Sequence, residues 1–146
     1  MPSSPVTPAE YRALAEFRHQ LLRFLRFSEQ AARRAGLAPQ QHQLLLAVRG
    51  MPAGTAATVG TLAQRLQRRH HSTVGLVDRL EARGWVRRAR ERADRREVTV
   101  RLTRRGETVL ARLALAHRTE IRSLAPHLAR ALRDVIRGDD GVGAPR

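Results

Sequence analysis

The segment STVGLVDRLEARGWVRR, residues 72–88, contains the pattern that determines the fold. A helix turns about 100° per residue, so the apolar residues of this segment gather on one side of it. That side is expected to face the core and contains Thr73, Leu76, Val77 and Leu80. Gly84 follows where a glycine commonly ends a helix in the left-handed conformation. The segment therefore predicts a helix from about residue 71 to 83 whose other side is left for a partner.

Two short strands are expected directly after this helix. The first begins at Trp85-Val86, and the second is residues 98–102, VTVRL, where apolar and polar residues alternate. The basic stretch between them, ARERADRR at 89–96, is typical of a hairpin tip. Upstream, we expect a brief helix capped by Thr61. Short helix, turn, second helix and hairpin together are the layout of a winged helix-turn-helix, whose second helix enters a major groove of DNA.

The positive charge of the chain is concentrated in the same region. All 28 basic residues are arginine, against 13 acidic residues, for a net charge of +15. Between Arg65 and Arg105 there are 14 arginines and five acids, which places +9 of that charge in 41 residues. A GC-rich genome would explain arginine in place of lysine but not this excess. General solubility and attraction to a membrane surface remain alternatives, but nucleic acid is the favoured partner.

The exposed side of the predicted helix is the expected DNA surface. Its first turn offers backbone N–H groups to a phosphate, and the small residues Ser72 and Gly75 let the backbone approach the groove. Arg79 and Arg83 are expected to hold phosphates.

At the hairpin tip, an arginine is expected to bind in a narrow minor groove, where the negative potential attracts it, and Asp94 is expected to orient that arginine by ion pairing. The expected DNA-binding residues are His71, Ser72, Gly75, Arg79, Arg83, Asp94, Arg95 and Arg96. The alternatives are an ordinary amphipathic helix with a solvated basic side and a solvated loop.

The flanking segments predict a mainly α-helical protein. Thr7, Pro8 and Glu10 are typical of a helix start, and Thr103 is expected to cap a long helix that runs to about Ser123. Pro126 is expected to open a separate, final short helix. The first predicted helix has a row of apolar residues on one side and further apolar side chains outside that row, which indicates that a second chain packs against this helix. We expect disordered ends at 1–7 and 138–146, a helical dimerisation region at 8–35 and 103–137, and a winged helix-turn-helix DNA-binding domain at 36–102.

Several classes of function are disfavoured by what the sequence lacks. The chain has no cysteine, which excludes disulfides, thiolate metal sites and thiol redox sensing. Its apolar runs are shorter than the roughly 18–20 residues that span a bilayer, and no signal segment begins it, so we expect a cytoplasmic protein. Six histidines without a His-x3-His pair argue against metal. No catalytic motif is present, so we expect neither an enzyme nor a cofactor.

Three strings together resemble the MarR family of bacterial transcription regulators. They are LAQRL at 62–66, STVGLVDRLEARGWVRR at 72–88 and DRREVTVRLTRRG at 94–106, the last with the D-x-R pair of the wing and an L-T-x-x-G sequence. GLAPQQHQLLLAV at 36–48 also matches, so the resemblance covers roughly residues 8–137.

The resemblance implies a homodimer that presents two winged domains to a pseudo-palindromic site on double-stranded DNA. Arg96 matches the arginine that reads the minor groove and Asp94 its orienting partner, while Arg79 matches an arginine that grips the DNA backbone. Gly75 departs from members that place a long polar side chain there, so base reading shifts to His71, Ser72 and Val74.

The resemblance also implies a small aromatic or anionic effector, bound where the dimer helices meet the winged domain. In this sequence that junction would draw on Phe17, Leu21, Phe24, His42 and Leu45, which the alternative interpretation treats as plain core and dimer residues. The expected function is a sequence-specific, ligand-responsive repressor. The alternative is an architectural protein that coats DNA without choosing a sequence.

Overall fold

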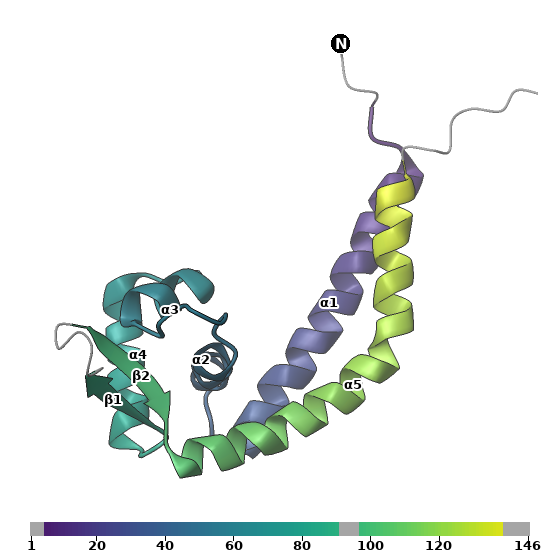
Figure 1. The fold of residues 1–146 in the computed structure, drawn as a ribbon. Coiled ribbons are helices and arrows are strands. Elements are labelled where there is room, and N and C mark those ends of the chain that lie inside the picture. Colours follow the sequence, from purple (N-terminus) through teal and green to yellow (C-terminus); the bar gives the residue numbers. More distant parts are fainter. Residues whose placement is uncertain (1–4, 91–96, 139–146) are drawn as a thin grey trace, which may run out of the picture. The chain divides into compact units, whose positions relative to one another are not determined.

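Helices dominate the chain, with one hairpin before the last of them (Figure 1). The structure, a computed structural model, describes residues 5–90 and 97–138. The elements in chain order are α1 (Pro8–Arg34), α2 (Pro39–Arg49), α3 (Val59–Arg65), α4 (His70–Ala82), β1 (Val86–Arg90), β2 (Val98–Leu102) and α5 (Arg104–Arg137). The predicted fold class, mainly α with a small hairpin wing, is confirmed.

The chain divides into two compact units. One contains residues 1–28 and 116–146, and the other contains residues 29–115. The second unit thus includes the end of α1 and the start of α5 in addition to the expected DNA-binding domain. The predicted disorder at the two ends falls largely outside the described residues.

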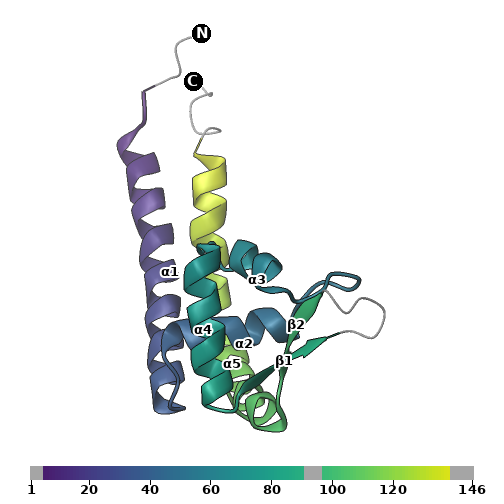
Figure 2. The same cartoon turned by 90° about the vertical axis from the view of Figure 1, so that its left-hand side faces the viewer.

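The first unit is a pair of antiparallel helices, the first part of α1 beside the last part of α5 (Figures 1 and 2). Thr7 caps α1 as predicted, because its Oγ1 accepts a hydrogen bond from the Glu10 N–H at 3.2 Å. The Glu10 carboxylate in turn accepts from the Thr7 N–H at 2.5 Å. These backbone and side-chain hydrogen bonds with Thr7 lower the pKa of Glu10 below its ordinary value.

The predicted break at Pro126 is wrong, because Pro126 lies inside the single helix α5. A proline within a helix removes one backbone hydrogen bond and costs about 3 kcal/mol. Leu124 and Ala131, on either side of it, are buried at 4 % and 2 % exposure. Burying a leucine-sized side chain is worth about 1.5–3 kcal/mol, so a continuous buried stripe across the proline outweighs the lost bond.

The second unit encloses the larger core. The face of α4 predicted to be buried is buried, since Thr73, Leu76, Val77 and Leu80 are all at most 1 % exposed. Side chains from α2, α3, the hairpin and α5 pack around it, including Leu44, Leu45, Leu62, Trp85, Val86, Val100 and Leu110. This core fixes α4 against the rest of the unit.

Local hydrogen bonds set the ends of the elements in this unit. Thr58, and not Thr61 as predicted, caps α3: its backbone is extended, and its Oγ1 accepts from the Thr61 N–H at 3.2 Å. Gly84 ends α4 at a φ of +75° as predicted. Thr103 caps α5 by accepting from the Gly106 N–H at 3.1 Å, and its hydroxyl donates to the Gly84 carbonyl at 2.6 Å. The start of α5 is thereby joined to the end of α4.

The hairpin is antiparallel, with Val86 opposite Leu102 and Arg90 opposite Val98. A further backbone bond, from the Val100 N–H to the Ala57 carbonyl at 2.9 Å, attaches the loop before α3 to β2.

Candidate nucleic-acid interface

A tight turn joins α3 to α4. The helix α3 ends at Arg65 with Leu66 as its C-cap, and the Arg68 N–H donates to the Ala63 carbonyl at 2.9 Å. Between them Gln67 adopts a φ of +53°, in the left-handed region that favours glycine. Short helix, sharp turn and second helix form the helix-turn-helix that the sequence predicts.

The side of α4 away from the core has the expected composition. His71, Arg79 and Arg83 are exposed, while Ser72 and Gly75 are half-buried. The N-cap is Arg69, whose side chain carries only donors and caps none of the first N–H groups. The hydroxyls of Ser72 and Thr73 both donate to the Arg69 carbonyl, at 3.0 and 2.9 Å. The first turn of α4 therefore has no side-chain cap and can offer its N–H groups to a phosphate.

Arg79 covers the space above Gly75. A Cβ added to Gly75 would lie 3.5 Å from Nη1 of Arg79, an ordinary van der Waals contact. Helical side chains lean toward the N-terminus, so a residue four positions later reaches back over this glycine. The guanidinium of Arg79 thus lies over the middle of the exposed side.

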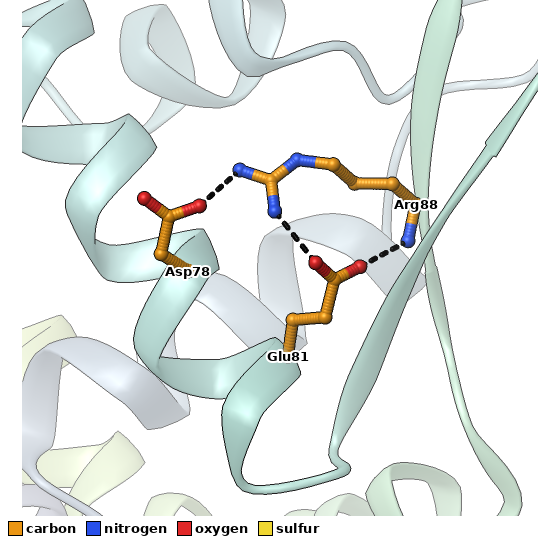
Figure 3. A network of polar contacts seen from close by, with 3 residues as sticks. All are labelled: Asp78, Glu81 and Arg88. Atoms are coloured by element: carbon orange, nitrogen blue, oxygen red, sulfur yellow. Dashed lines mark hydrogen bonds and ion pairs between the residues drawn. The ribbon is translucent and has the colours of Figure 1, made fainter.

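Arg88 of β1 binds both acidic side chains of α4 (Figure 3). Its Nη2 lies 2.6 Å from Oδ1 of Asp78, and its Nη1 lies 2.9 Å from Oε1 of Glu81. The Arg88 N–H also donates to Oε2 of Glu81 at 2.8 Å. Burial acts to lower the pKa of Arg88, but the hydrogen bonds and charges of Asp78 and Glu81 outweigh it and raise that pKa. Both acids of α4 are thereby paired with the wing, and the single charge of Arg88 offsets one of their two negative charges.

Sequence reasoning missed Arg88. The available signal was the presence of two acids, Asp78 and Glu81, on the predicted DNA-facing helix of a strongly basic segment. Such acids need compensation if the helix meets a polyanion.

Trp85 is buried against two guanidinium groups. The Cζ atoms of Arg83 and Arg105 lie 5.5 and 5.4 Å from the centre of its ring. Nη1 of Arg105 donates to the Arg83 carbonyl at 3.0 Å. Arg83, expected to hold a phosphate, is exposed and lies over this ring.

The expected contacts at the hairpin tip are Asp94, Arg95 and Arg96, and they lie outside the described residues. Their assignment as wing contacts stays a prediction.

The five expected effector residues belong to different units. Phe17, Leu21 and Phe24 lie on α1 in the first unit, where Phe24 and Phe27 contact the ring of His117 edge-on. His42 and Leu45 lie on α2 in the second unit, and both are buried. An effector site built from them also stays a prediction.

The order of these elements, with an exposed second helix and a hairpin directly after it, defines a winged helix-turn-helix protein. In the described residues, no helix has the length and apolarity needed to cross a membrane.

Comparisons with known proteins place this architecture in a family. A sequence profile of the MarR family matches residues 35–97. The transcriptional repressor CouR, solved bound to a 23-mer DNA duplex, is 30% identical over 82% of each chain, with a TM-score of 0.61. The chain belongs to the MarR family of transcriptional regulators.

Two more distant structures share the fold. AbsC from Streptomyces coelicolor, a MarR family regulator, is 19% identical, with coverage of 95% of this chain and 99% of that one and a TM-score of 0.69. A MepR variant from S. aureus, bound to an oligodeoxyribonucleotide, is 17% identical, with coverage of 84% and 88% and a TM-score of 0.62. No curated protein sequence matches the chain significantly.

Proposed function

We propose that this protein is a homodimeric repressor that binds a pseudo-palindromic operator in double-stranded DNA and releases it when a small effector binds. The observation that carries the proposal is the exposed side of α4, which combines an uncapped first turn with Arg79 and has both of its acids paired with Arg88. CouR, the relative at 30% identity, was solved as a repressor on a DNA duplex.

The charges of α4 fit a DNA-facing role. An acidic side chain near a phosphate backbone repels it, and α4 carries two of them, Asp78 and Glu81. Both bind Arg88, and the charges of Arg88 and Arg79 together balance theirs, so the positive end of the helix is left to attract a phosphate. His71 and Ser72, in the first turn, are the proposed base-reading residues.

The homodimer is supported by apolar surface in the first unit. Leu14, Leu22 and Leu25 on α1 are 49 %, 53 % and 43 % exposed, and Ile136 on α5 is also largely exposed. Contiguous exposed apolar surface commonly marks an interface. A second copy that packs against these helices would bury it and supply the second reading helix.

The effector is proposed to be a small aromatic or anionic molecule, bound by Phe17, Leu21, Phe24, His42 and Leu45. Its test is a thermal-shift screen of aromatic acids and phenols, with and without the upstream DNA of the gene. A compound that stabilises the free protein and lowers its affinity for that DNA supports the proposal.

Sequence preference separates a regulator from an architectural DNA-binding protein. A regulator should prefer its own upstream region over unrelated duplex by at least about 10³-fold, measured by fluorescence anisotropy with competitor DNA. Equal affinity for both duplexes would favour the architectural alternative.

The wing is tested by Arg96→Ala. Losing a minor-groove arginine should weaken operator binding by about 1–3 kcal/mol while the protein stays dimeric. Arg34→Ala, which removes an exposed arginine at the end of α1, is the matched control and should change affinity much less. If both variants bound operator as the unaltered protein does, the wing assignment would be wrong.

A further inference from the structure

The end of α4 offers three consecutive backbone carbonyls to a neighbouring element. The helix ends in a Schellman motif, in which the Trp85 N–H donates to the Leu80 carbonyl at 3.0 Å. The Gly84 N–H donates to the Glu81 carbonyl, also at 3.0 Å. The N–H groups of a helix bond to carbonyls earlier in the chain, so the carbonyls of Arg83, Gly84 and Trp85 have no partner within α4. They need partners from another element.

The start of α5 supplies a partner for each of these carbonyls. The Thr103 hydroxyl donates to the Gly84 carbonyl at 2.6 Å, and the Thr103 N–H donates to the Trp85 carbonyl at 3.1 Å. Nη1 of Arg105 donates to the Arg83 carbonyl at 3.0 Å. The carbonyl end of a helix is partially negative, so a guanidinium is favourable there. We call these contacts the α4–α5 joint, and all of them lie within the second unit.

Gly106 lets the two helix ends touch at the joint. A Cβ added to Gly106 would overlap the Trp85 carbonyl oxygen and lie 3.1 Å from the Trp85 carbonyl carbon. Rotation of a side chain cannot relieve an overlap with a backbone atom. Any other residue at this position would therefore push the start of α5 away from Trp85.

Arg105 also contacts the ring of Trp85. Its Cζ atom lies 5.4 Å from the ring centre, and its Nη1 atom lies 4.0 Å from the position of a Cβ added to Gly84. The Trp85 side chain is 4 % exposed and belongs to the core that fixes α4. Arg105 thus binds the end of α4 twice, through a carbonyl and through a buried ring.

The joint lies at the opposite end of α4 from the proposed reading residues. The helix has 13 residues and is about 20 Å long. A tilt of about 5° at the joint would therefore displace the first turn of α4 by about 2 Å. From the joint, α5 continues along the chain into the first unit, which contains the proposed dimer surface.

We propose that Arg105 is a positioning residue for operator binding. It fixes the direction of α4 relative to the start of α5, so that the two copies of α4 in a dimer fit their half-sites together. Arg105 acts through the end of α4 and does not itself contact DNA. The inference rests on the dimeric repressor proposed above.

The test compares two duplexes, the operator mapped by footprinting in the upstream DNA of the gene and the same duplex with one half-site scrambled. Arg105→Gln removes the guanidinium that bonds the Arg83 carbonyl. Fluorescence anisotropy should show at least about fivefold weaker operator binding, because a smaller fraction of dimers then holds both reading helices in the competent orientation. Affinity for the half-scrambled duplex should change less than about twofold, since one half-site needs only one reading helix and Arg88 still joins α4 to the wing.

Two further variants control this experiment. Arg104→Gln removes the same charge from the preceding residue, which is exposed and lies outside the joint, and should leave both affinities unchanged. Gly106→Ala opens the joint from the backbone side and should reproduce the loss of operator binding. Thermal unfolding and sedimentation velocity check that each variant is folded and dimeric. If Gly106→Ala does not fold, Arg105→Gln alone decides the test.

Three outcomes would overturn the proposal. Equal operator affinities of Arg105→Gln and Arg104→Gln would show that the joint does not position α4. An equal loss of affinity for both duplexes would also contradict it, and a salt slope lowered by about 0.9 would then identify Arg105 as a phosphate contact. If the unaltered protein bound both duplexes equally, the dimeric repressor would be wrong and this inference would fail with it.

Discussion

Gly75 lies in the middle of the exposed side of α4, where an ordinary helix would carry a side chain. Glycine inside a helix costs about 0.5–1 kcal/mol relative to alanine, and a Cβ here meets Arg79 at an unstrained 3.5 Å. Gly75→Ala should therefore raise the free energy of unfolding by about 0.5–1 kcal/mol in urea titrations. The same methyl group should weaken operator binding, because it stands where α4 approaches the groove.

The matched control for this variant is Gly60→Ala on α3, where the nearest atom to an added Cβ is 3.8 Å away. It should stabilise the protein similarly and leave operator affinity unchanged. If Gly75→Ala bound operator as tightly as Gly60→Ala does, close approach of the backbone at Gly75 would be refuted.

Arg88 connects two elements, because it holds β1 to α4 through Asp78 and Glu81. Its guanidinium is partly exposed, so we expect Arg88→Ala to lower the free energy of unfolding by only about 1 kcal/mol. The effect on operator affinity should be larger, since two carboxylates on α4 lose their partner beside the phosphate backbone. Anisotropy titrations measure it, with Arg90→Ala on the same strand as the control. Equal affinities of the two variants would contradict this role.

The helix α5 passes through Pro126 without ending there. Pro126→Ala should restore one backbone hydrogen bond and remove a steric conflict. It should thus raise the free energy of unfolding by about 1–2 kcal/mol, less than the full penalty of a helical proline because the unfolded chain also gains freedom. Urea denaturation measures the change. A destabilised variant would mean that the packing of Leu124 and Ala131 depends on the proline.

Element by element, the sequence predicts what local chemistry determines. The buried face of α4 follows from periodicity, and the ends at Thr7, Gly84 and Thr103 follow from capping. The predicted cap at Thr61 was wrong because a neighbouring threonine, Thr58, caps α3 instead. The predicted helix break at Pro126 was wrong because the burial of side chains on either side of the proline keeps α5 continuous. The contacts of Arg88 and Arg105 were not predicted, because they depend on the packing of β1 and of the start of α5 against α4.

At the scale of the whole molecule, the first unit buries few large side chains and exposes many. On α1, Tyr11, Leu14, Leu21, Leu22 and Leu25 are exposed, and at 100° per residue they cover one continuous stripe with Leu25 near its centre. If a second copy covers this stripe, the unfolding midpoint should rise with protein concentration.

Leu25→Glu tests the stripe directly, because it would bury an unpaired carboxylate in the interface. We expect sedimentation velocity to show a monomer at concentrations where the unaltered protein is a dimer. Operator affinity should fall steeply, since a single winged domain contacts one half-site and makes about half the phosphate contacts. The slope of log affinity against log salt should therefore also be about halved.

Gln30→Glu adds the same charge on an exposed position of α1 and should change neither the dimerisation nor the operator affinity. If the Leu25→Glu protein stayed dimeric, the dimer interface would have to lie elsewhere on the chain. If it were monomeric and still bound operator with the full salt slope, a single subunit would be sufficient for operator binding.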